Sequence, residues 1–123
     1  MAVLTIDHVQ VAIPAGAEDR ARDFCGGILG LREVPKPANL AARGGAWFES
    51  AGARIHLGIE AGFRPAAKAH VALLVDDLRA IVSRCAHGGY RVAEGEPMPG
   101  YERAYVYDPF GNRIELMEQK TIS

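Results

Sequence analysis

Alternating apolar and polar residues predict the elements of the first half of the chain. From Leu4 to Ile13 the alternation has the period of a β-strand, and Pro14 ends it. The segment Ala17–Leu29 carries two carboxylates near its start and is followed by Gly30, which are features typical of a helix. The full prediction for this half is a strand at 4–13, a helix at 17–29, strands at 31–34, 46–49 and 54–59, and a loop at 35–45.

The same order of elements returns in the second half. Asp76 is a candidate N-cap for a helix from Asp77 to Ala86, which Gly88 and Gly89 would end. The chain then closes with a β-hairpin, because Asp108-Pro109-Phe110-Gly111 is turn chemistry between two strand-forming segments. The full prediction for this half is strands at 69–75 and 90–93, a helix at 77–86, a loop at 95–100 and a hairpin within 101–118.

Two short motifs recur between the halves. Ile6-Asp7-His8-Val9 corresponds to Lys68-Ala69-His70-Val71 at an offset of 62 residues, and the six residues from Gly52 correspond to those from Gly111 at an offset of 59. Internal repeats of this kind identify architecture. We therefore predict an α+β fold in which paired βαβββ modules form a curved, cupped mixed sheet with helices on the outside. The modules of this single domain would span about 1–61 and about 66–123.

In each module, one face of the strands is apolar and the other carries polar residues. The polar face holds His8 and His56 in the first module and His70 and Glu115 in the second, at positions matched by the repeat. Each residue alone is explained as a strand residue with satisfied hydrogen bonds, but four on one face predict a site. Two or three imidazoles and a carboxylate suit one divalent metal ion, with Fe, Zn, Ni, Mn and Co as candidates.

Four further residues are weaker candidates for catalysis or substrate binding. Tyr105 and Tyr107 share the inner face of the predicted hairpin, where a tyrosine can donate to a bound oxygen, act as an acid or serve as a core aromatic. Arg43 in the loop and Arg113 on the last strand could meet an anionic substrate, although arginines in such places are often only solvated. Trp47 is predicted to be core or a wall of the cup.

Composition narrows the classes of partner and location. The 123 residues carry a net charge of −1, so electrostatics predicts neither nucleic acid nor an anionic membrane as partner. Cys25 and Cys85 lack metal-ligand spacing and form no disulfide framework, which favours buried thiols in a reducing cytosol. The first residues lack the basic region and apolar run of a signal peptide, and no transmembrane segment is visible. We predict a cytoplasmic protein.

Four motifs together resemble the vicinal oxygen chelate superfamily, which includes glyoxalases, bleomycin resistance proteins and extradiol dioxygenases. They are Ile-Asp-His-Val at 6–9, Phe-Cys-Gly-Gly-Ile-Leu-Gly-Leu at 24–31, His-Val-Ala-Leu-Leu-Val-Asp-Asp at 70–77 and Asp-Pro-Phe-Gly-Asn-Arg-Ile-Glu-Leu at 108–116. The resemblance covers nearly the whole chain. It implies that paired modules form one cup, in which a metal ion chelates two adjacent oxygens of a substrate or intermediate.

By position, the resemblance implies that His8, His70 and Glu115 are metal ligands. His56 stands where glyoxalase I has a fourth ligand, usually glutamate, and about where extradiol dioxygenases have a catalytic histidine that is not a ligand. Tyr105, ten residues before Glu115, matches the tyrosine of the extradiol signature, although two other positions of that signature differ.

The resemblance leaves three functions open. The first is a metal-dependent enzyme on a small substrate, either glyoxalase-like or dioxygenase-like. The second is a metal-free protein that binds a small aromatic drug without chemistry. The third is thiol transfer to fosfomycin, for which the potassium loop and the phosphonate-binding residues are not identifiable. Open sheet edges also predict a homodimer, in which the two modules of a cup come from one chain or from two.

Overall fold

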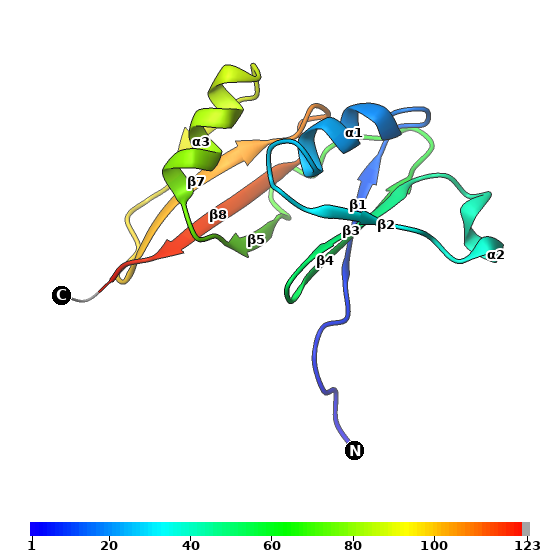
Figure 1. The fold of residues 1–123 in the computed structure, drawn as a ribbon, viewed down its shortest axis with the longest axis horizontal. Helices are drawn as coiled ribbons and strands as arrows, with labels where there is room; N and C mark the ends of the chain where they lie inside the picture. Colours follow the sequence, from blue (N-terminus) through cyan, green and yellow to red (C-terminus); the bar gives the residue numbers. More distant parts are fainter. Residues whose placement is uncertain (122–123) are drawn as a thin grey trace. The chain divides into compact units, whose positions relative to one another are not determined.

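The computed structural model describes residues 1–121, which form two compact units (Figure 1). The first unit ends at Phe63 and the second begins at Arg64. Each unit is a four-stranded mixed sheet with one helix longer than a single turn. The α+β class and the repetition of the same set of elements, both predicted from the sequence, are confirmed.

The sheet of the first unit has the strand order β1-β4-β3-β2. β1 runs parallel to β4, whereas β3 is antiparallel to both of its neighbours. The elements of this unit are β1 (Val9–Ile13), α1 (Glu18–Cys25), β2 (Arg32–Val34), α2 (Ala38–Ala41), β3 (Ala46–Ser50) and β4 (Ala53–Ile59).

The sheet of the second unit has the equivalent order, β5-β8-β7-β6. β5 is parallel to β8, and β7 is antiparallel to both β8 and β6. The elements of this unit are β5 (Val71–Leu74), α3 (Leu78–His87), β6 (Val92–Glu94), β7 (Tyr101–Tyr107) and β8 (Arg113–Gln119).

The pairing register also repeats between the two sheets. Gln10 of β1 lies opposite His56 of β4, and Ala72 of β5 lies opposite Glu115 of β8. Gln10 and Ala72 are separated by 62 residues and His56 and Glu115 by 59, which are the two offsets of the sequence repeat. Because residues that face each other across a ladder share a face of the sheet, His56 and Glu115 occupy equivalent places on the polar faces of their sheets.

Alternation also places an apolar core in each unit. In the first unit, Ile13 of β1 and Phe24 of α1 have no exposed surface. In the second unit, Val106 of β7, Leu116 of β8 and Cys85 of α3 are fully buried. Burial of apolar surface of this kind is the main favourable contribution to folding. Within residues 1–121, no helix has both the length and the apolar character that crossing a bilayer requires.

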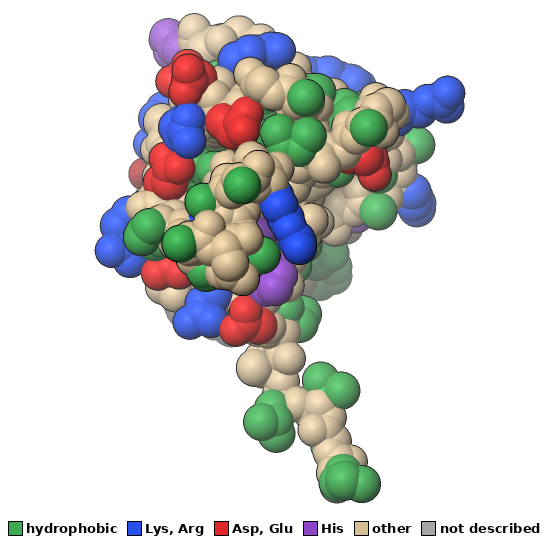
Figure 2. Space-filling model, turned by 90° about the vertical axis from the view of Figure 1, so that its right-hand side faces the viewer, with side chains coloured by type: hydrophobic (Ala, Val, Ile, Leu, Met, Phe, Trp, Pro, Cys, Tyr) green, Lys and Arg blue, Asp and Glu red, His purple; other side chains and the backbone are tan. Residues whose placement is uncertain are grey.

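Three predicted boundaries in the first unit are wrong. β1 begins at Val9 rather than Leu4, because β4 pairs with it only from Val9 onward, and the preceding segment projects with Leu4 and Ile6 exposed (Figure 2). α1 ends at Cys25 rather than Leu29, since two glycines follow Cys25 and glycine disfavours helix. The predicted loop at 35–45 contains the short helix α2.

The N-cap of α3 is Asp77, one residue later than predicted. Its carboxylate accepts a 3.1 Å hydrogen bond from the Ala80 N–H, and Glu118 accepts one of 2.7 Å from the Leu78 N–H. We expect Asp77→Ala to lower the free energy of unfolding by about 1 kcal/mol, because the Ala80 donor loses its partner. Asp76→Ala should change it by less than about 0.5 kcal/mol. Urea unfolding of both variants measures the difference, and equal effects would contradict this assignment of the cap.

Candidate functional site

In the second unit, a group of polar side chains lies on the polar face of β7 and β8. Tyr105 and Glu115 are directly opposite each other, and His70 immediately precedes β5, the neighbour of β8. His70 Nε2 is 3.0 Å from Oε1 of Glu115, whose side chain is only 8% exposed. The structure therefore brings two of the predicted metal ligands into contact.

The partners of His70 determine which ring nitrogen carries the proton. Its Nδ1 lies 2.9 Å from the Lys68 carbonyl oxygen, which can only accept, so Nδ1 donates. Arg113 donates to the same carbonyl at 3.0 Å, so the 3.2 Å between Arg113 Nη2 and His70 Nδ1 separates two donors that share one acceptor. His70 Nε2 is therefore the ring nitrogen that a metal ion would take, in place of its 3.0 Å hydrogen bond with the Glu115 carboxylate.

This arrangement of His70 and Glu115 fits a divalent metal ion. Two neighbouring ligands that bind one ion at about 2.1 Å and at right angles lie about 3.0 Å apart. The observed separation of Nε2 and Oε1 is 3.0 Å. Histidine ligands also characteristically donate their other N–H to a carboxylate or a backbone carbonyl, as His70 does to Lys68.

Arg103 of β7 joins this cluster, although it was not among the candidates predicted from the sequence. Its Nη1 donates to the Tyr105 hydroxyl oxygen at 3.0 Å and lies 3.3 Å from Oε2 of Glu115. The hydrogen bond to Tyr105, and then the charge of Glu115, raise the pKa of Arg103. Because the Tyr105 oxygen accepts from Arg103, its own hydroxyl proton can be donated to another group. Alternation along β7, which puts Arg103 on the same face as Tyr105, was the signal that could have found it.

The other two candidates of the second unit differ in their surroundings. The Arg113 guanidinium lies 4.6 Å from the centre of the Tyr105 ring, so Arg113 belongs to the cluster around Glu115. Tyr107 is covered instead by the guanidinium of Arg91, at 4.3 Å from its ring centre. Tyr107 therefore lies at the border of the cluster, next to the start of β6.

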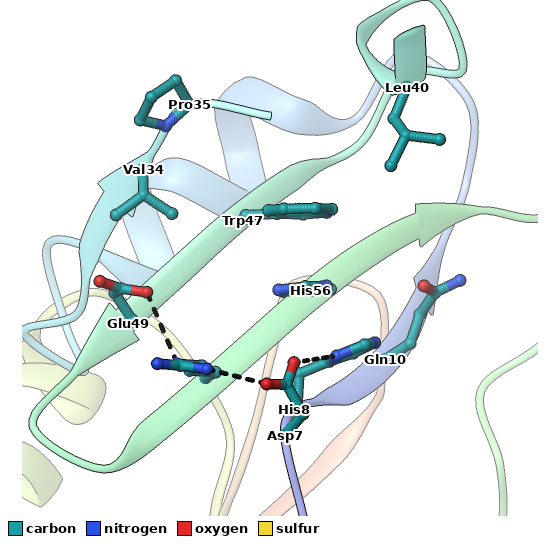
Figure 3. A pocket seen from close by; sticks show the side chains of 10 residues that line it. Asp7, His8, Gln10, Val34, Pro35, Leu40, Trp47, Glu49 and His56 are labelled. Carbon is teal, nitrogen blue, oxygen red and sulfur yellow. Dashed lines mark hydrogen bonds and ion pairs between the residues drawn. The ribbon is translucent and has the colours of Figure 1, made fainter. Parts of the chain in front are cut away.

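In the first unit, three rings form a stack on the polar face of the sheet (Figure 3). The His56 ring lies between those of His8 and Trp47, with centroids 3.9 Å from each and interplanar angles of 17° and 5°. Burial, and then the charge of His8, lower the pKa of His56, so this ring is neutral at neutral pH. Both faces of the ring are covered, and only its edge is available to a ligand.

Asp7 orients the His8 ring. Its Oδ2 lies 3.0 Å from His8 Nδ1, and its Oδ1 accepts a 2.9 Å hydrogen bond from Arg54. The hydrogen bond with His8, more than the charge of Arg54, lowers the pKa of Asp7. Because an ionised carboxylate only accepts, Nδ1 of His8 donates to Asp7, and Nε2 is the ring nitrogen left for another partner. The sequence interpretation had not singled out Asp7, although it adjoins a predicted ligand.

A cavity of about 500 Å³ lies beside the ring stack and is bounded on its apolar side by Val34, Pro35, Leu40 and Trp47. A second hollow of about 280 Å³ shares Leu40, Trp47 and Gln10 with it. Figure 3 shows Leu40 of α2 over the indole face that His56 does not cover. The first unit therefore contains two neighbouring spaces that share an aromatic wall, and the larger is big enough for a small molecule.

The predicted ligand set appears as two pairs, one in each unit. His8 and His56 belong to the first unit, and His70 and Glu115 belong to the second. Among the residues that the structure describes, no three or more histidine, cysteine, aspartate or glutamate side chains are grouped so that they could hold a metal ion. Arg43 lines the second hollow of the first unit.

Comparisons with known proteins agree in one family. A family model described as Glyoxalase/Bleomycin resistance protein/Dioxygenase superfamily matches residues 5–116. A glyoxalase family protein from Bacillus anthracis is 44% identical, with 98% of each chain covered and a TM-score of 0.90. None of the curated protein sequences matches this chain.

Two more distant structures share the fold. A fosfomycin resistance protein from Listeria monocytogenes is 15% identical, with 97% of this chain and 96% of that chain covered and a TM-score of 0.77. An antibiotic binding protein from Streptomyces sp. CB03234 is 22% identical, with 98% and 99% covered and a TM-score of 0.70. At these identities the likeness concerns the fold alone.

Proposed function

Because the chain belongs to the glyoxalase/bleomycin resistance protein/dioxygenase superfamily, we propose that it is a metal-dependent enzyme of the glyoxalase or dioxygenase type. Its substrate would be a small molecule that presents two neighbouring oxygen atoms to the metal. Members of this superfamily bind small molecules and commonly use a divalent metal ion. The observation that carries the proposal is the contact between two predicted ligands, since His70 Nε2 lies 3.0 Å from Oε1 of the Glu115 carboxylate.

We assign one divalent ion, Fe, Zn, Ni, Mn or Co, to His8, His70 and Glu115. In both histidines Nδ1 contacts a neighbouring acceptor oxygen, and both immediately precede the first strand of their unit, at matched positions of the repeat. Arg103 lies at Oε2 of Glu115, which leaves Oε1 for the ion. These shared features support a common role for the two histidines.

The ring stack favours proton transfer over metal binding for His56. A metal ion bound by an imidazole nitrogen lies about 2.0–2.1 Å from that nitrogen, along its lone pair in the ring plane. The planes of His8 and His56 are nearly parallel and stacked, with centroids 3.9 Å apart, so they do not meet near the nitrogen atoms. If His8 is a ligand, His56 in this arrangement is not a second one. Its lowered pKa keeps it in the neutral form, which can accept a proton.

The proposed chemistry assigns distinct tasks to the side chains. The metal ion, when bound, supplies Lewis-acid stabilisation of negative charge on the substrate oxygens. Tyr105 donates its hydroxyl proton to a substrate oxygen, since its own oxygen already accepts from Arg103. His56 takes and returns a proton through its ring edge. Arg103 holds both Tyr105 and Glu115 in place.

His56→Gln is expected to separate metal binding from turnover. Metal affinity should stay within about threefold of wild type, because this side chain is not a ligand, whereas turnover should fall at least about 100-fold, a usual contribution of a general acid–base group. Chelator competition gives the affinity, and kinetics of the reconstituted protein gives the turnover. A variant that loses its metal together with its activity would return His56 to the ligand set.

The identity of the metal distinguishes the two forms of the enzyme. Aerobic reconstitution with Fe(II) should support turnover of catechols only if the protein is of the dioxygenase type, since that reaction uses Fe(II) and O2. A glyoxalase-type enzyme should act instead on the adduct of a thiol with a 2-oxoaldehyde, through proton transfer between adjacent carbons. Turnover of neither substrate class by any of the five metal forms would contradict the proposed enzyme.

A second candidate function is binding of a small aromatic drug without chemistry. The observation that favours it is the cavity of about 500 Å³ with Trp47 in its wall. Tight binding of an aromatic ligand by protein that holds no metal after reconstitution, together with lack of turnover, would favour this function. Retained binding of a divalent ion by His8, His70 and Glu115 would argue against it.

The proposal extends to assembly and location. The edge strands β1, β2, β5 and β6 of the two sheets leave backbone groups unpaired within their sheets, which supports the prediction of a homodimer. Sedimentation at several concentrations tests it, and a monomer that keeps its metal at every dilution would count against the dimer. A cytoplasmic location stays a prediction, supported by the burial of the Cys25 and Cys85 thiols.

A further inference from the structure

The second hollow of the first unit has a distinctive charge. Lys36 and Arg43 line it, together with apolar groups and the Gln10 amide, and no carboxylate belongs to its described lining. Glu18 lies close by, because its Oε2 accepts a 3.1 Å hydrogen bond from the Gly45 N–H and would be 3.2 Å from a Cβ at Gly44, so it offsets one of the two positive charges. Lys36 donates one proton to the Gly44 carbonyl oxygen, which leaves two protons for another acceptor. This hollow therefore carries an excess of positive charge.

The larger cavity differs, because its charged residues compensate one another. Asp7 and Glu49 both lie within ion-pair distance of Arg54, at 2.9 Å and 4.0 Å. These three residues are at the end of the cavity that contains His8, which is also the end where the proposed enzyme holds its metal. A bound molecule would thus meet compensated charge at one end and an excess of positive charge at the other.

Trp47 links the two spaces. His56 covers one indole face at 3.9 Å, and the other face is turned toward Leu40 of α2 (Figure 3). An indole face with apolar neighbours is a favourable surface for a flat, apolar group. Gly58 leaves room for the Gln10 side chain, because a Cβ at position 58 would lie 2.4 Å from the Gln10 amide nitrogen. The missing side chain at position 58 allows the Gln10 amide to lie where the two spaces adjoin.

From these features we infer the substrate class of the proposed enzyme: a flat, apolar molecule with a carboxylate or a comparable anionic group at the end remote from the metal-binding oxygens. The flat part would stack on Trp47 below Leu40, and the anionic group would reach Lys36 and Arg43. This inference rests on the proposed function for the metal-binding end. The binding of the anion itself needs only residues of the first unit.

The test uses 2-naphthoate and its uncharged analogue 2-naphthamide, with protein freed of metal by a chelator. Trp47 is the single tryptophan of the chain, so its indole N–H gives one assignable signal in a nitrogen–proton correlation spectrum. We expect 2-naphthoate to shift this signal saturably and 2-naphthamide to bind at least about tenfold more weakly, because two charge contacts are lost. The affinity for 2-naphthoate should also fall as salt concentration rises.

Three variants locate the charge contacts. Arg43→Gln and Lys36→Gln should each weaken binding of 2-naphthoate about three- to fivefold, the effect of losing one partly solvated ion pair. Arg79→Gln is the matched control, because Arg79 is an exposed arginine on α3 of the second unit. This variant should bind 2-naphthoate with the affinity of wild type. An unchanged indole signal in the ligand-free variants shows that the first unit has kept its fold.

Equal binding of the two naphthalenes, or variants that do not weaken 2-naphthoate, would overturn the anionic substrate class. Failure of both compounds to shift the Trp47 signal would overturn the binding of a flat group as well. Since no metal is present in this experiment, a negative result with the naphthalenes does not bear on the metal site, which metal-binding measurements test separately. Conversely, variants of His8, His70 or Glu115 that lose the metal do not change the meaning of the naphthoate result.

Discussion

Glu115→Gln is expected to lower the affinity for the divalent ion by about 100-fold or more, while the fold is retained. Glutamine keeps the shape of the side chain but removes its negative charge, and second-shell changes around metals already cost about 10- to 100-fold. Glu115 is the single carboxylate of the proposed ligand set, and its side chain is only 8% exposed, so solvent replaces it poorly. Competition with a coloured chelator measures the affinity.

Glu102→Gln provides the matched control. Glu102 is an exposed glutamate of β7, the strand beside β8, and β-strand alternation places it on the face of β7 opposite to Tyr105. Loss of the Glu102 charge should leave the metal affinity within about twofold of wild type, because salt largely screens a charge that is exposed to solvent. Equal metal binding by wild type and Glu115→Gln would remove Glu115 from the ligand set.

Gly45→Ala is expected to lower the free energy of unfolding by about 2–5 kcal/mol. Gly45 has a φ of +80°, and a Cβ there would lie 2.0 Å from the Leu57 carbonyl oxygen. The left-handed conformation costs a residue with a side chain about 1–2 kcal/mol, and the overlap with backbone adds about 1–3 kcal/mol. Because Gly45 adjoins β3, the loss would also displace Trp47. Urea unfolding followed by the fluorescence of Trp47 measures the effect.

Gly16→Ala separates the two contributions. Gly16 has a similar φ of +74°, but a Cβ there would meet nothing within 4 Å. This variant should cost only the conformational part, about 1–2 kcal/mol. If both variants lost the same stability, the close approach of Gly45 to Leu57 would have no energetic role, and the explanation by overlap would be wrong.

The repeat allowed the topology to be predicted from the sequence. Strand alternation has a period of two, so a register error of one residue would move the apolar residues to the wrong face. The match of His56 with Glu115 followed from the repeat alone, and the pairing of Gln10 with His56 and of Ala72 with Glu115 shows that the two stand at equivalent places in their sheets. Whether these residues bind metal stays a prediction.

Several features of the site were not predictable in this way. Alternation says which face a side chain occupies, but not which rotamer it adopts, so the stacking of His56 between His8 and Trp47 was not foreseen. The role of Arg103 depends on its reach to Tyr105 and Glu115, which a long, flexible side chain does not reveal in sequence. Both features depend on side-chain packing rather than on period.

The predictions for the start of α3 and for the segment of α2 were wrong for local reasons. Asp76 and Asp77 have the same side chain, so composition could not distinguish the cap, whereas the backbone brings the Ala80 N–H to Asp77. The short helix α2 lies between prolines and glycines, which are typical of a loop. Its residue Leu40 nevertheless lies over the indole of Trp47 (Figure 3). A single turn of helix leaves no periodic pattern to detect.

The most direct test of the proposed function is the metal content of the protein. Wild-type, His8→Ala and His70→Ala proteins would each be dialysed against Fe(II), Zn, Ni, Mn and Co, and then against metal-free buffer, before elemental analysis. We predict that wild type keeps one divalent ion per chain for at least one of these metals and that both variants lose it. A folded wild-type protein that keeps none of the five, or variants that keep as much as wild type, would contradict the account.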